Sequence, residues 1–402
     1  MKFSHIADVH IGSWRDPKLK ELSSLAFIEA IDESIKEKVD FILIAGDLFN
    51  TAIPGIDLIK TVIRKLKEAK KANIPVYYIA GSHDFSPSGK TMLDIIEEAE
   101  LGINVTKGEI DEEDKLRLQF TIDQKTGVKI TGMIGKRGML EKKYYEALNL
   151  NNLEAEKGFK IFMFHTAIDE LKPEYLKDME STPASFLPKG FDYYAGGHVH
   201  IVAKKDLSEH GYKQIVYPGP TFPANFSELE KLGTGGFYIY HDGELNRKNI
   251  EIKKSLYKEF VIDGKTAVEA NSLILKELED TDVNDKIILL RVHGKLKEGR
   301  TSDIDFKEIL EELYNRKAYY VMKNTNKITS DEFKAVITEY HSAEEVEDKI
   351  IQEHLGQTPH IFSDEAETIQ KLMRTFSEEK NEGEKASDYE DRIKKDADVI
   401  IK

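Results

Sequence analysis

Short apolar runs alternate with helical spacing over the first hundred residues of the chain. Three runs of apolar and β-branched residues, each ending in Gly or Asp, predict buried strands: KFSHIAD at 2–8, DFILIAGD at 40–47 and PVYYIAG at 75–81. Apolar residues three or four positions apart predict three helices, over 18–39, 56–72 and 91–99. The pattern therefore predicts repeated strand–helix units at the start of the chain.

The next part of the chain is richer in strands. Five further apolar runs predict strands: KITGMIG (129–135), KIFMFH (160–165), DYYAGGH (192–198), QIVYPG (214–219) and GGFYIYHDG (235–243). Strand–helix units followed by a second set of strands predict an α/β core over 1–240, in which two sheets pack together with helices outside.

The pattern changes after residue 240. Strands are predicted at NIEIKK (249–254), EFVID (259–263) and KIILLRVHG (286–294), and helices over 267–279 and 305–314. This mixture predicts a small α+β domain over 241–328, appended to the first.

Two amphipathic stretches predict helices within 329–402. Ser342 and Glu345 form a capping-box pattern ahead of the first stretch. The second places four apolar residues on one face: Ile369, Leu372, Met373 and Phe376. Short helices without an obvious core of their own either dock on a partner or pack back on the chain, and the sequence leaves both interpretations open.

Composition narrows the class of protein. The chain has 402 residues, 40% hydrophobic and 33% charged, with 58 Lys and Arg against 73 Asp and Glu, a net charge of −15. An acidic balance argues against coating nucleic acid by bulk charge, although a locally basic groove stays compatible with it. No apolar run approaches a membrane span, and the polar start is unlike a signal peptide. The complete lack of Cys excludes disulfides and thiolate ligands and, with these features, predicts a cytoplasmic protein.

Histidine and aspartate residues cluster where the predicted strands end. Five strands each deliver at least one such side chain: Asp8 and His10, Asp47, His83 and Asp84, His165, and His198 and His200. A single His after a strand is usually a packing residue, but five such events at the same end of successive strands point to a shared site. Carboxylates and imidazoles without thiolates suit Mn, Fe or Zn. The sequence therefore predicts a metal site, with two metals sharing a carboxylate as the usual arrangement for phosphoester hydrolysis.

The motifs DVH, GDLFN, GSHD, a lone His after a strand, and GHVH resemble those of the calcineurin-like metallophosphoesterases. The resemblance implies a two-sheet α/β/β/α sandwich in which Asp8, His10, Asp47 and His200 hold one metal. It also implies that Asp47 bridges to a second metal shared with His165 and His198. His83 would protonate the leaving oxygen or stabilise the transition state, and Asp84 would orient His83 through a hydrogen bond.

Ser82 departs from the family pattern, which has Asn at this position as a ligand of the second metal. A Ser hydroxyl is shorter than an Asn amide and reaches a metal weakly or through water. The substitution predicts a weakened but working second site; the alternative is a degenerate domain that does not turn over.

The opening MKFSHIADVHIG and the stretch DFILIAGDLFNTAIP look most like the Mre-eleven nucleases (SbcD in bacteria) of double-strand-break repair. The resemblance implies two Mn²⁺ per chain, with Mg²⁺, Fe²⁺ or Zn²⁺ possible, and 3′-to-5′ exonuclease and endonuclease activity on DNA. It further implies a nucleoid-associated homodimer, a capping DNA-binding domain at 241–328, and C-terminal helices in 329–402 that bind a Rad-fifty (SbcC-type) ATPase. Alternatives are a phosphoesterase for a small phosphodiester and a weakly active scaffold.

Several loop residues are candidates for contacts with a nucleic-acid backbone, because scattered basic and polar side chains suit non-specific binding. The candidates are Arg15, Ser86, Ser88, Lys90, Lys136 and Arg137. Trp14, the only Trp, is a candidate for base stacking, with a packing role as the alternative.

Overall fold

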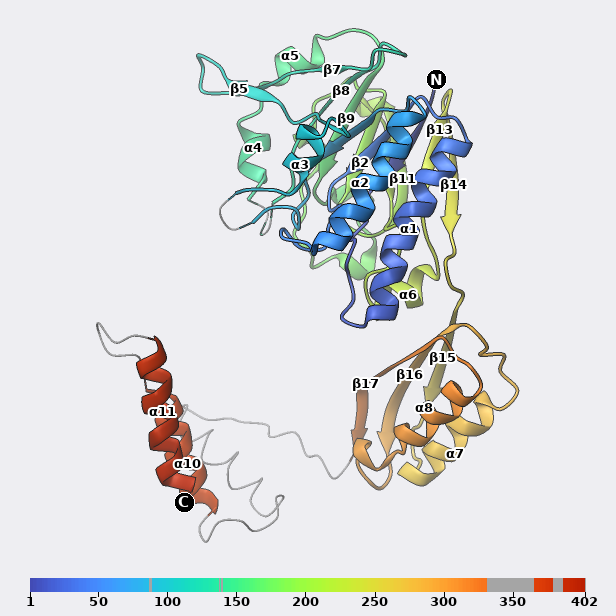
Figure 1. Cartoon of the computed structure of the whole chain (residues 1–402), viewed down its shortest axis with the longest axis vertical. Coiled ribbons are helices and arrows are strands. Elements are labelled where there is room, and N and C mark those ends of the chain that lie inside the picture. The colour runs from blue at the N-terminus through green and yellow to red at the C-terminus, as the bar shows by residue number, and fades with distance from the viewer. Residues whose placement is uncertain (87–88, 137, 139, 331–364, 379–385, 402) are drawn as a thin grey trace. The chain divides into compact units, whose positions relative to one another are not determined.

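Two six-stranded sheets stack face to face in the first 250 residues of the computed structural model (Figure 1). The structure describes residues 1–402 except 87–88, 137, 139, 331–364, 379–385 and 402. In order across the first sheet, the strands are β14 (Glu244–Ile250), β13 (Gly235–His241), β1 (Lys2–Ile6), β2 (Phe41–Ala45), β3 (Val76–Ile79) and β4 (Ile103–Asn104). The second sheet has the order β11 (Val202–Leu207), β12 (Tyr212–Pro218), β10 (Tyr193–Gly197), β9 (Lys160–His165), β8 (Lys129–Gly132) and β7 (Thr121–Ile122). A hairpin of β5 (Gly108–Ile110) and β6 (Leu116–Leu118) lies apart from both sheets.

Burial on both faces explains why the central strands are continuously apolar. Along β2, Phe41 and Leu43 face the second sheet, whereas Ile42 and Ile44 face the helices. The residues between the sheets form a core of their own that includes Met163 of β9. The predicted two-sheet α/β sandwich is confirmed.

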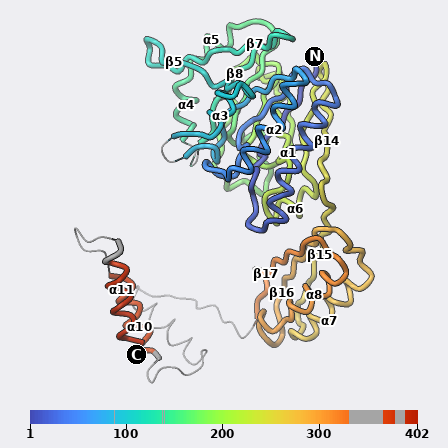
Figure 2. The backbone as a smooth tube through the Cα atoms, in the orientation of Figure 1, coloured from blue at the N-terminus to red at the C-terminus, as the bar shows by residue number. Residues whose placement is uncertain are grey.

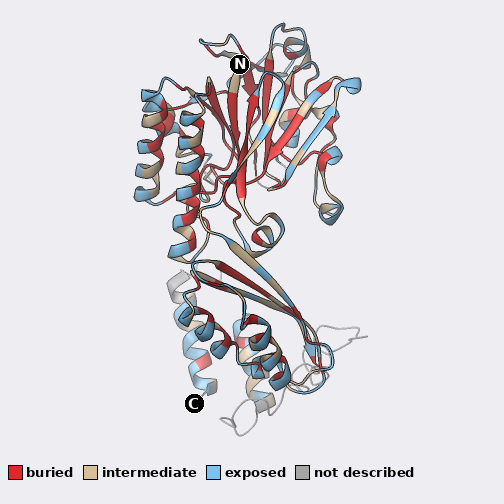
Figure 3. Cartoon of the chain, turned by 90° about the vertical axis from the view of Figure 1, so that its right-hand side faces the viewer, coloured by how far each residue is buried: buried red, intermediate tan, exposed pale blue. Residues whose placement is uncertain are grey.

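Helices cover both outer faces of this sandwich (Figure 3). On the first sheet lie α1 (Pro17–Lys36), α2 (Ile56–Lys71) and α3 (Leu93–Glu98), and on the second α4 (Lys142–Glu146) and α5 (Leu150–Glu154). Helix α6 (Phe226–Leu232) joins β12 to β13, and short 3₁₀ turns cover Asp169–Leu171, Glu174–Leu176, Ala184–Phe186, Ser208–His210 and Thr301–Asp303. Helix α1 begins where the sequence signals a start, because Pro17 occupies its first turn and the Asp16 side chain accepts a hydrogen bond from the Lys18 N–H.

A smaller α+β module follows within the same compact unit, which spans Met1–Thr329. Its strands β15 (Ser255–Val261), β16 (Ile287–Leu296) and β17 (Tyr320–Ser330) form a three-stranded sheet under α7 (Ala267–Leu278) and α8 (Phe306–Asn315). The first four residues of strand β16 are buried, so this part of the strand is covered on both faces. Ile288 and Leu290 pack in the module's own core, whereas Ile287 and Leu289 join the core beneath α1.

The strand predicted over 249–254 is wrong. Strand β14 ends at Ile250, and it pairs antiparallel with β13 as an edge of the first sheet, because Asp242 and Gly243, both at positive φ, turn the chain back tightly. Strands β11 and β17 were not predicted, since their polar sequences VAKKDL and YVMKNTNKITS carry little apolar signal.

The second compact unit spans Ser330–Lys402 and contains α10 (Glu365–Phe376) and α11 (Ala386–Ile401), which lie side by side (Figure 2). Helix α10 confirms the amphipathic helix predicted around Ile369 and Phe376. The stretch predicted after Ser342 lies outside the described residues. In the part of the chain that the structure describes, no helix is both long and apolar enough to span a membrane.

Candidate metal centre

The first sheet delivers both carboxylates of the candidate site. Strands β1, β2 and β3 run parallel, so their carboxyl ends meet at one edge. Asp8 and His10 follow β1 and Asp47 follows β2, and the backbone N–H of His10 donates to the Asp47 carbonyl. Gly46 sits at φ +84°, and a Cβ there would collide with the His165 ring. The missing side chain of Gly46 is what lets the two sheets approach at the site.

The second sheet delivers only imidazoles. His165 ends β9, and His198 and His200 follow β10, which runs parallel to β9. The His198 backbone N–H donates to Asp8 Oδ1 over 2.8 Å, which ties the two edges together. The His165 Nδ1 faces the Ala45 carbonyl at 2.9 Å, and this turns its Nε2 toward Asp47.

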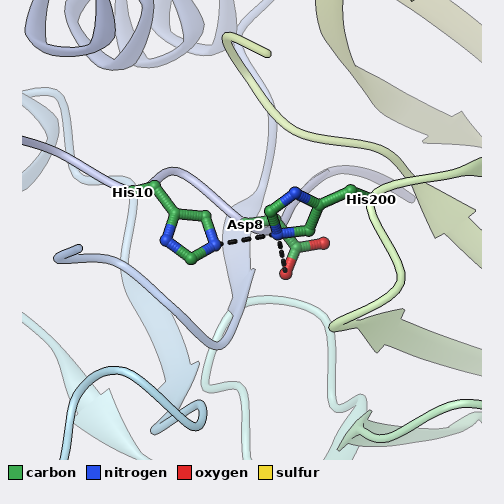
Figure 4. Close-up of side chains that lie close together, drawn as sticks. All are labelled: Asp8, His10 and His200. Atoms are coloured by element: carbon green, nitrogen blue, oxygen red, sulfur yellow. Dashed lines mark hydrogen bonds and ion pairs between the residues drawn. The ribbon is translucent and has the colours of Figure 1, made fainter. Parts of the chain in front are cut away.

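The side chains from the two edges converge on shared space. His10 Nε2 and His200 Nε2 lie 2.9 Å apart, and His200 Nε2 is 3.9 Å from Asp8 Oδ1 (Figure 4). Asp47 Oδ2 lies 3.2 Å from His165 Nε2 and 3.5 Å from His10 Nε2. Three groups of possible ligand atoms, each within 4.8 Å of one another, result: Asp8, His10 and His200; His10, Asp47 and His83; Asp8, Asp47 and His165.

The backbone at these ligands is unusual. Five of the seven ligands predicted from the sequence have positive φ although none is glycine: Asp8 (50°), His10 (45°), Asp47 (50°), His198 (99°) and His200 (53°). Left-handed backbone at a residue with a side chain costs of order 1 kcal/mol, and such positions gather at functional sites. The fold therefore keeps these side chains in the site although their backbone conformations are unfavourable.

Burial and mutual charge set the protonation of the cluster. Burial disfavours a charged His165 ring, but Asp47 and then Asp8 outweigh it and raise its pKa to about 10. The same contacts lower the pKa of Asp47 against the opposing effect of its burial. Burial, and then the charge of His165, lower the pKa of His198 to about 3. The two carboxylates thus favour positive charge on His165, whereas burial and the nearby charge of His165 favour a neutral His198.

The donor set fits divalent cations. It contains carboxylate oxygens and imidazole nitrogens in close array, and His10 Nδ1 and His165 Nε2 are buried without a hydrogen-bond partner. Two imidazole nitrogens aimed at each other across 2.9 Å, beside a carboxylate, match the way that ligands surround one cation. Asp8, His10 and Asp47 each belong to two of the three groups, so these three residues lie where the groups overlap.

Ser82 and His198 lie at the margin of these groups. Ser82 is buried, with Oγ 3.4 Å from Asp47 Oδ2, and the His198 ring lies beside that of His165 with 5.2 Å between centroids. Neither belongs to the three ligand groups found among the described residues. Both nevertheless border the Asp47 and His165 side of the cluster.

His83 and Asp84 are placed differently from each other. The backbone N–H of His83 donates to Asp47 Oδ1 over 2.7 Å. The His83 ring lies edge-on to the ring of His10, and its Nδ1 is 2.9 Å from the Asn50 carbonyl oxygen. The Asp84 carboxylate instead accepts from the backbone N–H groups of Phe49 and Gly81. Asp84 is expected to orient His83, but the hydrogen bonds of its carboxylate go to the backbone, and the ring of His83 instead contacts the Asn50 carbonyl.

Two contacts of the site escape sequence reasoning. The Asn50 carbonyl is a backbone atom and carries no signal. Glu228 Oε1 lies 2.9 Å from His200 Nδ1. Its spacing from the helix-capping Asn225 could have drawn attention to α6, but nothing in the sequence ties that helix to His200.

The candidate nucleic-acid contacts differ in exposure and in their hydrogen bonds. Arg15 and Lys90 are exposed, and Ser86 is half-buried, with its backbone N–H donating to the Lys90 carbonyl. Lys136 donates to the Tyr144 hydroxyl over 2.7 Å. Ser88 and Arg137 lie outside the described residues. Trp14 packs on the core and donates to the Pro223 carbonyl, which supports its packing role.

Comparison with known proteins places this geometry in a family. The family model of the calcineurin-like phosphoesterases matches residues 1–202, which is half of the chain. The chain is 27% identical over 296 residues to the DNA double-strand break repair protein Mre11 of Archaeoglobus fulgidus, an alignment that covers 72% of the chain and 62% of that relative. It is 26% identical over 384 residues to the protein of the same name from Saccharolobus solfataricus, covering 92% and 93%. An uncharacterized metallophosphoesterase of Bacillus subtilis, YhaO, is 25% identical over 299 residues, covering 70% and 67%.

The family motifs and the converging ligands fall on the same residues. Asp8, His10 and Asp47 lie within the matched range, as do His165 and His200. The chain belongs to the calcineurin-like phosphoesterase family.

Proposed function

We propose that the chain is a manganese-dependent DNA nuclease that hydrolyses phosphodiesters in double-strand-break repair. The observation that carries the proposal is the meeting of two carboxylates and four imidazoles at one buried edge, with Asp47 shared between ligand groups. Several relatives named as break-repair proteins, matched over up to 92% of the chain, support DNA as the substrate. Divalent cations, when bound, would neutralise charge on a phosphodiester and activate water for its hydrolysis.

Some residues of the chain would hold the metals, and His83 would act on the substrate. Asp8, His10, Asp47 and His200 would hold one Mn²⁺, and Asp47, His165 and His198, with Ser82, the second; Mg²⁺, Fe²⁺ or Zn²⁺ would fit the same donors. Because its Nδ1 is 2.9 Å from the Asn50 carbonyl, the ring of His83 keeps a proton there. Its Nε2, protonated in the imidazolium form, would then donate to the leaving oxygen or to the phosphate.

The decisive experiment uses end-labelled linear duplex DNA with and without Mn²⁺. Mn²⁺-dependent shortening from the 3′ end, and cleavage of circular single strands, are the expected exonuclease and endonuclease results. Activity confined to a chromogenic phosphodiester would favour a small-substrate phosphoesterase. Metal binding without any cleavage would favour a scaffold.

Contacts with DNA would come from the exposed loops beside the site and from the 241–328 module acting as a cap. Arg15 and Lys90 are the exposed basic candidates among the described loops. Because such contacts release counterions, replacing both with Gln should flatten the salt dependence of DNA binding. An unchanged salt slope in fluorescence anisotropy would remove these loops from the interface.

The 329–402 region would bind a Rad-fifty (SbcC-type) ATPase. Helix α10 exposes Phe376 by 60%, and α11 exposes Val399 by 72%. Large apolar side chains left in water on amphipathic helices suit a partner groove. Deleting 330–402 should leave a folded nuclease that no longer co-purifies with the ATPase. Aggregation of the shortened chain would instead show that these helices complete its own core.

We also expect a homodimer formed through helices of the core, located with the nucleoid in the cytoplasm. The loop that leads into α2 exposes Ile53 by 77%, and Ile56 at the start of α2 is exposed by 71%. Light scattering of the wild type and of an Ile53→Glu, Ile56→Glu double variant would test this face. A wild-type monomer would contradict the expectation.

A further inference from the structure

Helix α6 places a carboxylate directly behind one of the candidate metal ligands. Glu228 Oε1 lies 2.9 Å from His200 Nδ1, and the other oxygen of Glu228 accepts the Ala224 N–H over 2.8 Å. The Glu228 side chain is only 18% exposed, and the Asn225 amide also donates to it. The contacts with Ala224 and Asn225 therefore hold the carboxylate in position independently of His200.

This contact decides which nitrogen of His200 is available. A neutral imidazole has one N–H and one lone pair, and a carboxylate acceptor keeps the proton on the nitrogen that faces it. Held through Nδ1, His200 directs the lone pair of Nε2 at the space shared with Asp8 and His10. Histidine ligands of metals are commonly oriented in this way.

The opposite side of α6 is bound to the α+β module through an ion pair. Arg291 on β16 forms a two-pronged ion pair with Glu230, donating from Nε and Nη2 to the two carboxylate oxygens. Both side chains are less than a fifth exposed. The Arg291 guanidinium also lies 5.4 Å from the centre of the Phe226 ring, at the first residue of α6. Two residues of one short helix therefore join a metal ligand to the module.

We propose that Glu228 is the positioning residue for His200, and that Arg291, through Glu230 and α6, sets how tightly the cation beside His200 is held. A force or ligand that moves the module would thus alter the metal site without contacting it. The inference rests on the proposed function, because it requires a divalent cation at Asp8, His10 and His200.

The first test is calorimetric titration of Mn²⁺ into metal-free protein. Glu228→Gln keeps the reach and an acceptor oxygen but loses the charge, whereas Glu228→Asp keeps the charge but is one carbon too short. Loss of an orienting partner typically weakens metal binding by about 10–100-fold. We expect about 10-fold for Glu228→Gln and a larger loss for Glu228→Asp, at one of the two sites only. Lys231→Gln, on the same helix but facing the Tyr175 ring, is the matched control and should bind as wild type.

Thermal unfolding in chelator separates positioning from folding. If Glu228 acts on His200, the Glu228→Gln variant should lose more stability relative to the wild type with Mn²⁺ than without it. Equal losses with and without Mn²⁺ would reduce Glu228 to a structural role and overturn the proposal. A wild-type protein that binds no divalent cation would instead defeat the proposed function itself.

The second test addresses the path from the module. Arg291→Gln should weaken the same site by about 5-fold, the lower end of usual coupling between distant sites. Because Arg291 is proposed to act through Glu228, the Glu228→Asp, Arg291→Gln double variant should bind no more weakly than Glu228→Asp alone. Fully additive losses, or an unchanged affinity in Arg291→Gln, would overturn the link.

Discussion

The two sheet edges that meet at the candidate site contribute different chemistry. The edge after β1 and β2 supplies both carboxylates, and the edge after β9 and β10 supplies three imidazoles. Asp47 reaches ligands from both edges, because its Oδ2 lies 3.5 Å from His10 Nε2 and 3.2 Å from His165 Nε2. Carboxylates from one sheet are thus completed by imidazoles from the other, and the site exists only where the sheets are packed together.

Removing the shared carboxylate should have the largest effect. Asp47→Asn takes away the charge that would offset two cations, so we expect both to be lost and nuclease activity to fall to background. Metal content by mass spectrometry and cleavage of labelled DNA measure this. His198→Gln, on the imidazole edge, is the matched variant and should lose only one ion. Two bound ions and normal cleavage in Asp47→Asn would break the comparison.

His83 tests whether the carboxylate edge also carries a group that acts on the substrate rather than on metal. His83→Ala should keep its metal content and lose turnover by about 10²–10⁴-fold, the usual range for a general acid. The measurement pairs metal analysis with single-turnover cleavage. If metal and activity disappear together, His83 is a ligand, as its place beside His10 and Asp47 would also permit.

Ser82 offers a way to sharpen the difference between the two cation positions. An Asn amide oxygen reaches farther than a hydroxyl, so Ser82→Asn should tighten the weaker Mn²⁺ site by about 10-fold. Activity should rise at limiting Mn²⁺ and converge with the wild type at saturation. Calorimetry of the two proteins decides the matter, because two equal affinities in the wild type would contradict the premise.

The contact between the sheets should have the smallest effect on metal binding and cleavage, because it acts on stability alone. His5 of β1 lies fully buried, 2.9 Å from the Tyr193 hydroxyl of β10, and burial lowers its pKa to about 3. In the unfolded chain His5 binds a proton near pH 6.5, whereas in the folded chain it stays neutral down to about pH 3. The free energy of unfolding therefore falls as the pH drops from about 6.5 toward 3. The slope from one such proton is about 1.4 kcal/mol per pH unit.

Urea unfolding in chelator at several pH values isolates this term. The His5→Phe, Tyr193→Phe double variant removes both polar partners and should show a flatter pH dependence than the wild type. Tyr193→Phe alone retains the histidine and should keep the slope. A double variant with an unchanged slope would mean that other buried groups carry the pH response.

The sequence was sufficient for the parts of the molecule governed by local pattern. Apolar runs located the central strands, and topology then required Asp8, Asp47 and His165 to meet at the carboxyl ends. Polar edge strands such as β11 escaped because one partner and much solvent leave little apolar signal. The partner of the Asp84 carboxylate and the role of Glu228 depend on contacts between distant segments, which no local pattern encodes.

Strand β16 contributes side chains to two hydrophobic cores, and so links the folding of the module to that of the sandwich. Ile287 and Leu289 are completely buried in the core beneath α1, while the neighbouring Ile288 and Leu290 belong to the module's own core. Separating the two parts would expose Ile287 and Leu289 to water, at about 3–6 kcal/mol for the two side chains together. That is a large share of the 5–15 kcal/mol that typically holds a domain folded. The module expressed alone should therefore be less stable than the same residues within the whole chain.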